Sequence, residues 1–167
     1  MKKLIVSIFC ILSIPLLCNL PVFRNMDIAR AQNKSTLTAN DVKQIKNTTK
    51  KIIKVALSLN QKAFVQYISP NYSSKANETI IDYTEFKSKI EKSFNKFTKQ
   101  GFVFSLKGNI TVEIIEETNK EVTVKTAYST NTYNKKTKKR TILPRIRKIT
   151  FAKENNKWKV TNWILLE

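Results

Sequence analysis

The stretch NITVEIIEETNKEVTVKTAY, residues 109–128, carries the pattern that decides the fold. Every second residue is apolar in ITVEI (110–114), and the alternate positions in VTVKTAY (122–128) are Val, Val, Thr and Tyr. Such alternation predicts β-strands that bury one face. The residues Thr118-Asn119-Lys120 lie between the two runs and favour a turn. We therefore expect an antiparallel hairpin here.

A second pair of strands is expected downstream, over residues 140–153 and 157–166, with a turn at residues 154–156. The doublet Arg147-Lys148 interrupts the alternation of the first strand, which predicts a β-bulge there. The expected apolar face of the last strand comprises Trp158, Val160, Ile164 and Leu166. Together the four strands predict a sequential antiparallel sheet that bends at its bulge.

Helical periodicity precedes the strands. Thr38 is placed to cap a helix, with Asp41 as its capping-box partner. Asn60 is expected to cap a second, short helix that ends at Pro70. The apolar residues that recur at helical spacing in the first helix are Val42, Ile45, Ile52, Ile53, Ala56 and Leu57.

A third helix is expected after a loop over residues 71–79. Asp82 is its predicted cap, and Gly101 is placed to end it in a left-handed conformation. The apolar stripe of this helix comprises Phe86, Ile90, Phe94 and Phe97. Helices followed by a run of strands predict an α+β fold, with three N-terminal helices packed on an antiparallel sheet.

The composition excludes several kinds of chemistry. The chain has 167 residues, of which 31 are Lys or Arg and 12 are Asp or Glu, and it contains no histidine. Its two cysteines, Cys10 and Cys18, lie in the apolar N-terminal stretch. The rest of the chain lacks the thiols and imidazoles that zinc sites, disulfides and Cys/His catalysis require. We expect one compact domain with no metal and no cofactor.

The N-terminus has the pattern of a secretory signal peptide. Lys2 and Lys3 precede the apolar run LIVSIFCILSIPLLC (4–18). The later sequence Ala29-Arg30-Ala31 offers small residues to a signal peptidase before Gln32. The pattern predicts a protein that is exported to the periplasm or the extracellular space.

The domain layout follows from this leader. Residues 1–31 are the expected signal peptide, residues 32–37 a short polar tether, and residues 38–167 the folded domain. The alternative is an uncleaved membrane anchor over residues 4–23, because this uncharged run has about the length that spans a bilayer.

Three segments of this domain resemble the nuclear transport factor 2-like superfamily. They are LSLNQKAFVQYISPNY (57–72), DYTEF (82–86) and the ending NNKWKVTNW (155–163). The resemblance covers residues 38–167 and implies a strongly curved sheet folded over three helices, in a cone with a pocket between them. It implies no single activity, since the superfamily includes ketosteroid isomerases, polyketide cyclases, dehydratases and transport adaptors.

No residue is assigned a catalytic role. A catalytic carboxylate in such a pocket needs an apolar setting that raises its pKa, whereas Asp41, Asp82 and Glu85 already have capping explanations. Core packing also explains the aromatic residues. The residues that we expect to line a cavity, if one exists, are Tyr67, Tyr83, Phe86, Phe94, Tyr128 and Trp158.

A strongly basic stretch lies between Glu121 and Glu154, where no acidic residue occurs. The predicted anion-binding patch comprises Lys135, Lys136, Lys138, Lys139, Arg140, Arg145, Arg147 and Lys148. Its expected partners are anionic lipid headgroups or cell-envelope polymers. Export and the lack of a stacking motif argue against nucleic acid. The alternative is a solvated surface with no specific ligand.

These observations predict an exported, non-enzymatic binding or adaptor domain that engages an anionic envelope component or a partner protein. The oligomeric state is open, and the resemblance to the nuclear transport factor 2-like superfamily implies a homodimer through the sheet face as one form of self-association. The alternative is a small-molecule enzyme or ligand carrier, similar to ketosteroid isomerases or polyketide cyclases, that uses the interior of the cone.

Overall fold

The computed structural model of the chain describes residues 37–76, 79–118 and 120–166. The predicted signal peptide (1–31), the alternative anchor (4–23), both cysteines and residues 32–36 of the tether lie outside the described residues. Within the described ranges, no helix is long and apolar enough to cross a bilayer.

The first two helices begin where the sequence predicts. Helix α1 spans Ala39–Leu57 and starts with the expected capping box, in which the Asp41 backbone N–H donates to Thr38 Oγ1 at 3.1 Å and the Asp41 carboxylate accepts from the Thr38 backbone N–H at 3.3 Å. Helix α2 spans Gln61–Val65, and the side chain of Asn60 accepts a hydrogen bond from the Ala63 backbone N–H at 3.0 Å.

The third helix has the predicted cap at Asp82 and the predicted stop at Gly101. Helix α3 spans Tyr83–Lys99, and the side chain of Asp82 accepts from the Glu85 backbone N–H at 2.8 Å. Gly101 follows the helix with φ = +77°, a conformation that residues with a side chain rarely adopt. The helix therefore ends just before Gly101, as predicted.

The prediction of a loop over residues 71–79 is wrong, because this segment contributes to a small hairpin. Strand β1 spans Ser73–Ala76 and pairs antiparallel with β2, Thr79–Asp82. Strand β1 reads SSKA and β2 reads TIID, with two adjacent isoleucines, so neither strand shows apolar alternation. The hairpin is instead held by what lies beside it: Tyr72 is 2% exposed and stacks on Phe86, with 4.1 Å between ring centres.

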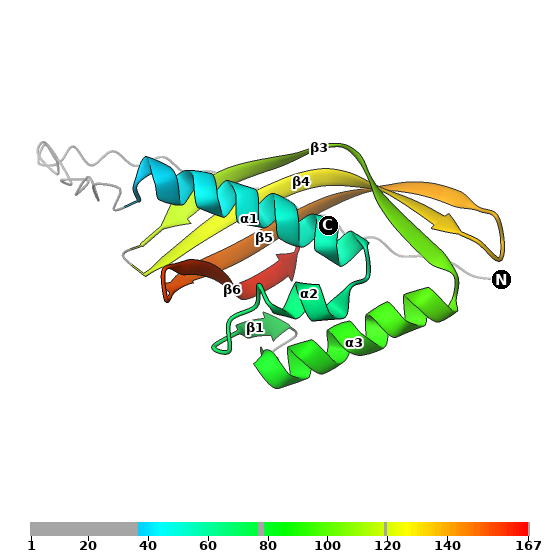
Figure 1. The fold of residues 1–167 in the computed structure, drawn as a ribbon, viewed down its shortest axis with the longest axis horizontal. Coiled ribbons are helices and arrows are strands. Elements are labelled where there is room, and N and C mark those ends of the chain that lie inside the picture. The colour runs from blue at the N-terminus through cyan, green and yellow to red at the C-terminus, as the bar shows by residue number, and fades with distance from the viewer. Residues whose placement is uncertain (1–36, 77–78, 119, 167) are drawn as a thin grey trace, which may run out of the picture. The chain divides into compact units, whose positions relative to one another are not determined.

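The four remaining strands form one antiparallel sheet in chain order (Figure 1). They are β3, Phe102–Glu117; β4, Glu121–Asn134; β5, Arg140–Glu154; and β6, Lys157–Leu165. The two predicted hairpins are confirmed, although β3 starts already at Phe102. Figure 1 shows the long strands curving, with α1 running across one face. We call this covered face the inner face.

The bulge predicted at Arg147-Lys148 is wrong. Strands β4 and β5 pair without a shift from Tyr133↔Arg140 to Glu121↔Ala152. The irregularity lies instead in β6, where Thr150 pairs with Asn162 and Phe151 with Val160, so that Thr161 is the extra residue.

This bulge changes which side chains of β6 face inward. The expected inner set of Trp158, Val160, Ile164 and Leu166 is only half right. After Thr161, Trp163 packs against the core in place of Ile164, while Leu166 is 47% exposed. A single extra residue reverses the alternation because side chains in a strand point to opposite faces in turn.

The core lies between α1, α2 and the inner face of the sheet. Its fully buried members include Ile45, Ile52, Phe64, Val122, Val124, Ile149, Phe151 and Val160. Helix α3 has no buried residue and reaches this core through Phe86 and Phe94, whose ring centres lie 6.3 and 5.8 Å from that of Phe64.

Candidate functional site

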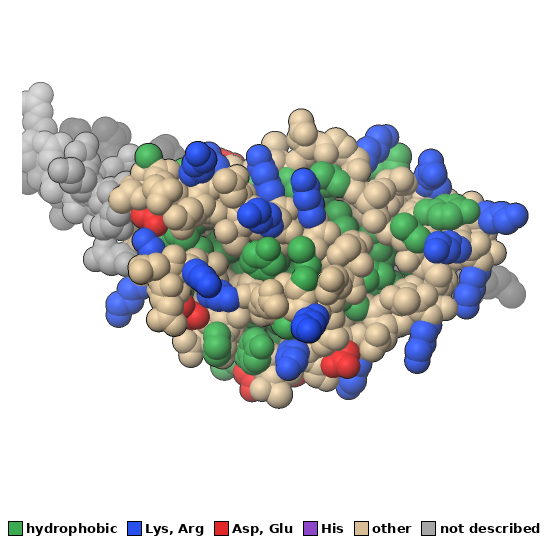
Figure 2. Space-filling view, in the orientation of Figure 1, with side chains coloured by type: hydrophobic (Ala, Val, Ile, Leu, Met, Phe, Trp, Pro, Cys, Tyr) green, Lys and Arg blue, Asp and Glu red, His purple; other side chains and the backbone are tan. Residues whose placement is uncertain are grey.

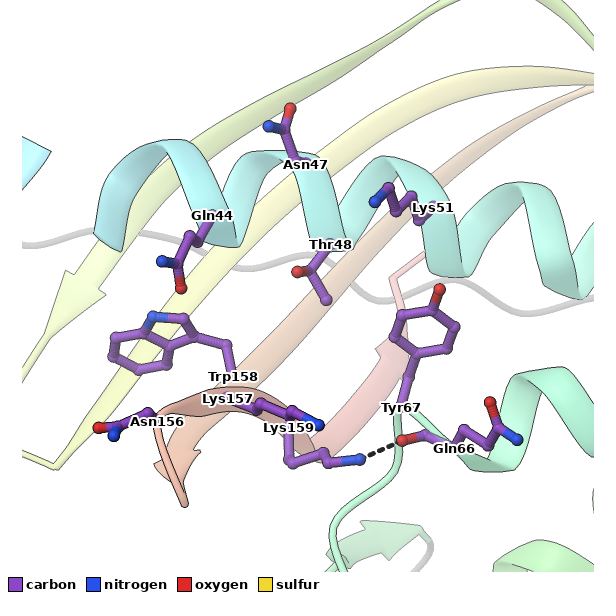
Figure 3. A pocket seen from close by; sticks show the side chains of 10 residues that line it. All are labelled: Gln44, Asn47, Thr48, Lys51, Gln66, Tyr67, Asn156, Lys157, Trp158 and Lys159. Atoms are coloured by element: carbon purple, nitrogen blue, oxygen red, sulfur yellow. Dashed lines mark hydrogen bonds between the residues drawn. The ribbon is translucent and has the colours of Figure 1, made fainter. Parts of the chain in front are cut away.

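A groove with a volume of about 660 Å³ lies between α1, the residues after α2, and the start of β6 (Figure 3). We call it the α1–β6 groove. The residues that line it are Gln44, Asn47, Thr48, Lys51, Gln66, Tyr67, Asn156, Lys157, Trp158 and Lys159.

Local structure positions both walls. Gln44, Thr48 and Lys51 share one side of α1, because residues three and four apart lie on the same helical face. The opposite wall begins at the β5–β6 turn, where Asn155 (φ = +47°) and Asn156 (φ = +61°) adopt the left-handed conformations of a two-residue hairpin turn. This turn directs the start of β6 along the groove.

The segment after α2 closes the groove on a third side. The backbone N–H of Val160 donates to the Tyr67 carbonyl oxygen at 2.9 Å, and that of Ser69 donates to the Val160 carbonyl oxygen at 2.9 Å. Lys159 Nζ donates to the carbonyl oxygen of Gln66. The edge of β6 is therefore already occupied by the chain's own backbone at this point.

Asp41 fixes the indole that forms the floor of the groove. Its Oδ1 accepts from Trp158 Nε1 at 3.2 Å and from Lys153 Nζ at 2.8 Å, while its Oδ2 accepts from the Thr38 hydroxyl at 2.7 Å. The Lys153 ammonium also lies 5.7 Å from the centre of the indole ring. These partners, Lys153 first and Thr38 next, hold the pKa of Asp41 well below its usual range. Asp41 is therefore ionised, and its carboxylate has a structural role.

The charge of the groove has one sign. Its lining includes Lys51, Lys157 and Lys159 and no acidic residue. Across the described residues, neither Lys51 nor Lys157 forms a salt bridge. The lining itself is therefore positively charged, and the nearest carboxylate along the chain is that of Glu154, which pairs with Lys157 across the β5–β6 turn without a salt bridge.

A second basic feature lies at the tip of the β4–β5 hairpin, residues 135–140, which we call the basic hairpin. Its cations Lys135, Lys136, Lys138, Lys139 and Arg140 are all exposed. The turn is held by the Asn134 side chain, which accepts from the backbone N–H groups of Lys136 and Thr137 at 2.9 and 3.1 Å. No salt bridge within the described part of the chain involves these cations. Figure 2 shows blue side chains projecting at this end of the molecule.

The other three members of the predicted patch lie elsewhere. Arg145 and Arg147 pair with Tyr128 and Thr126 and so lie on the inner face, where Arg147 Nε donates to the Tyr128 hydroxyl at 3.1 Å. Lys148 lies on the outer face and pairs with Glu116 at 2.8 Å. The eight predicted residues are thus divided among a hairpin tip and two faces of the sheet.

The residues predicted to line a cavity are also divided. Tyr67 and Trp158 line the α1–β6 groove, whereas Tyr83, Phe86 and Phe94 pack against the core cluster. Tyr128 is 8% exposed and contacts a separate buried cluster with Ile53 and Ile110.

Two further titratable side chains, those of Glu85 and Tyr72, make contacts within the fold. Glu85 pairs with Lys89 at 2.7 Å, one turn along α3, and burial raises the pKa of the Tyr72 phenol. Over the described ranges, no group of three or more His, Cys, Asp or Glu side chains is placed to hold a metal ion.

Sequence reasoning missed most of the groove. Gln44, Thr48, Gln66 and Asn156 appear in the sequence as ordinary polar positions of helices and turns. Their only local signal is the helical spacing of Gln44, Thr48 and Lys51, which is shared by every solvated helix face. Their proximity to residues 156–159 is a property of the packed domain.

No family model and no curated protein sequence matches the chain. Solved structures do match its fold. A ketosteroid isomerase-like protein from Erwinia carotovora atroseptica is 10% identical, with a TM-score of 0.61 over 78% of this chain and 99% of that one. A nuclear transport factor 2-like protein from Novosphingobium aromaticivorans is 13% identical, with a TM-score of 0.56 over 77% and 83%.

A third similar structure is the association domain of CaMKII from C. elegans, which is 13% identical, with a TM-score of 0.55 over 74% of this chain and 93% of that one. The Novosphingobium structure is described as having a cystatin-like fold. At these identities the likeness concerns the fold alone. The chain has the cystatin-like, α+β fold of the nuclear transport factor 2-like superfamily.

Proposed function

We propose that the chain is a non-enzymatic binding domain that acts after export and holds an anionic polymer of the cell envelope at its basic hairpin. The observation that carries this proposal is the group of five exposed cations on one short turn, none of which is neutralised by a carboxylate of the described residues. Arg140 lies 5.9 Å from the ring centre of Tyr133, and the four lysines have no such partner in the described parts of the chain. Cations that no carboxylate neutralises are available to an external polyanion.

The composition of the turn favours a polymer over a lipid bilayer. Residues 134–140 read NKKTKKR and contain no apolar side chain that could enter a membrane. Electrostatic attraction alone is worth about 1 kcal/mol for each Lys or Arg near an anionic surface. Such attraction weakens with salt. A flexible polyanion can contact several of these cations at once.

Chromatography on immobilised heparin and polyphosphate tests the proposal. The variant K135Q/K136Q/K138Q/K139Q is compared with K43Q/K46Q/K50Q/K54Q, which removes four exposed lysines from α1 and has the same net charge. We expect the hairpin variant to bind about 1,000-fold more weakly at low salt, because four lysines at about 1 kcal/mol each are removed. The α1 variant should elute close to the wild type.

Two outcomes would overturn the proposal. Equal losses of retention in the two variants would show that binding depends only on the net charge of the protein. Retention of the hairpin variant on heparin and polyphosphate at the strength of the wild type would place the anion site elsewhere.

The sheet also offers a surface for a protein partner or a second copy of the chain. Val103 and Ile142 lie on the outer face and are 42% and 47% exposed. One of the similar structures is an association domain. We propose self-association through this face as the way in which copies of the chain combine.

One observation favours the alternative of a ligand carrier that uses the interior of the fold. Arg147 lies 5.7 Å from the ring centre of Trp163 and binds Tyr128, and the buried hydroxyl of Thr126 opposite it has no hydrogen-bond partner among the described residues. One similar structure is a ketosteroid isomerase-like protein. A carrier of this kind would still bind its ligand when the four hairpin lysines are replaced. This result would distinguish ligand carriage from polyanion binding at the basic hairpin.

A further inference from the structure

The α1–β6 groove has the size of a site for a small molecule and is separate from the basic hairpin. Its volume of about 660 Å³ falls within the range of about 300–1,000 Å³ for ligand pockets. Strand β5 runs from Arg140 at the basic hairpin to Glu154 beside the β5–β6 turn, so the two features lie at opposite ends of this strand (Figure 1).

The lining offers groups that both donate and accept hydrogen bonds. The amides of Gln44, Gln66 and Asn156 and the hydroxyls of Thr48 and Tyr67 all have this property. None of these five side chains hydrogen-bonds to another described residue. Such a lining matches a ligand that carries several hydroxyl groups, because each hydroxyl also donates and accepts.

The charges of the lining select for an anion. Lys51 approaches from α1, and Lys157 and Lys159 come from β6 on the opposite wall (Figure 3). Lys159 is held by the Gln66 carbonyl oxygen, which leaves Lys51 and Lys157 as the free ammonium groups. Either ammonium group could give a charge-assisted hydrogen bond to a carboxylate or phosphate in the groove.

The floor of the groove is rigid before any ligand arrives. Trp158 is 8% exposed, and its indole is held by Asp41 and by the Lys153 ammonium. A site whose walls are already ordered loses less conformational entropy when it binds.

Other ligand classes fit this groove poorly. A peptide added as a strand needs a free backbone edge, whereas β6 is already bonded at Val160 to Tyr67 and Ser69. A nucleobase needs an open aromatic face for stacking, and because Trp158 is almost completely buried, Tyr67 is the one partly exposed aromatic side chain among the lining residues.

We propose that the α1–β6 groove binds a small anionic sugar, with its hydroxyl groups on the amide and hydroxyl side chains and its carboxylate or phosphate on the free lysines of the lining, Lys51 and Lys157. The site is independent of the basic hairpin and of the polymer proposed to bind there.

Titrations of the full chain, followed by amide NMR shifts, test this inference. The probes are D-glucuronate and glucose 6-phosphate, compared with glucose, inorganic phosphate and triglutamate. We expect saturable shifts at the lining residues with one or both anionic sugars, and affinities about tenfold lower for the other three probes. The two anionic sugars distinguish a carboxylate site from a phosphate site.

Matched variants locate the site. K51Q/K157Q should weaken binding of the anionic sugar about tenfold, whereas K43Q/K54Q, which has the same charge change outside the groove, should leave it unaltered. The hairpin variant should bind the sugar like the wild type even if polyanion retention is lost. Absence of saturable shifts with both anionic sugars, or equal binding of glucose or triglutamate, would overturn the proposal.

Discussion

At the scale of single residues, Asp41 links the start of α1 to the end of the sheet. One carboxylate completes the capping box with Thr38, pairs with Lys153 and orients Trp158. The residue is 7% exposed, so water cannot readily replace these partners. The capping role was predicted from the sequence, whereas the two contacts with β5 and β6 were not.

The substitution Asp41→Asn is expected to lower the melting temperature by several degrees. An amide has one oxygen in place of two, so it cannot accept from Thr38, Lys153 and Trp158 together. It also removes the charge that pairs with Lys153. Thermal unfolding followed by circular dichroism measures the loss. Asp82→Asn is the control, because Asn caps a helix about as well as Asp and Asp82 is exposed.

The stability lost in Asp41→Asn is also expected to depend on pH. The pKa of Asp41 is depressed in the folded chain, so its stabilisation is complete above the unfolded pKa of about 3.9 and is lost as pH falls toward the folded value. The difference in melting temperature between wild type and Asp41→Asn should therefore be constant above about pH 5 and shrink below about pH 4. A difference that stays constant down to pH 3 would contradict the ion pair.

At the scale of elements, two glycines define the path of β3. Gly101 (φ = +77°) joins α3 to the strand, and Gly108 (φ = +75°) lies where the pairing of β3 with β4 shifts between Lys107 and Thr111. The backbone N–H of Lys135 donates to the Gly101 carbonyl oxygen at 2.9 Å, which connects this junction to the basic hairpin.

Replacing either glycine by alanine should destabilise the domain. A left-handed backbone costs a residue with a Cβ roughly 1–2 kcal/mol. A Cβ at Gly101 would lie 3.5 Å from the Lys135 and Lys136 side chains, which is an ordinary contact, and a Cβ at Gly108 would meet nothing within 4 Å. We therefore expect similar losses for Gly101→Ala and Gly108→Ala in urea unfolding. The two variants control for each other, and a neutral effect at either site would refute the assigned backbone strain.

At the scale of the whole molecule, the outer face of the sheet is where copies of the chain are proposed to meet. Ile142 lies opposite Asn131 of β4 on this face, and Val103 lies opposite Tyr133 of β4, two residues farther along that strand. Burial of such side chains would favour pairing, because it removes apolar surface from water.

We expect concentration-dependent self-association that Ile142→Lys weakens about tenfold or more, since a charge would be buried at the contact. Sedimentation equilibrium measures it. Ile80→Lys is the control, because Ile80 is 68% exposed on β2, outside the four-stranded sheet. A wild type that stays monomeric at high concentration, or equal effects of both substitutions, would refute pairing through this face.

Local patterns in the sequence determined the three helix starts, the Gly101 stop and both long hairpins. Capping, periodicity and alternation depend on hydrogen bonds and side-chain directions within a few residues, so they can be read along the chain. The same reasoning identified the five cations of the basic hairpin, because they are consecutive or nearly so in the sequence.

The tertiary structure alone decided the β1–β2 hairpin, the bulge at Thr161 and the α1–β6 groove. Ser73–Ala76 pairs because Tyr72 is buried beside it, and Thr161 is displaced because both Val160 and Trp163 face the core. Gln44 and Trp158 meet across the groove only because α1 packs on a sheet whose last strand is formed far away in the sequence. Contacts of this kind follow from the packing of whole elements, which no local pattern of residue types records.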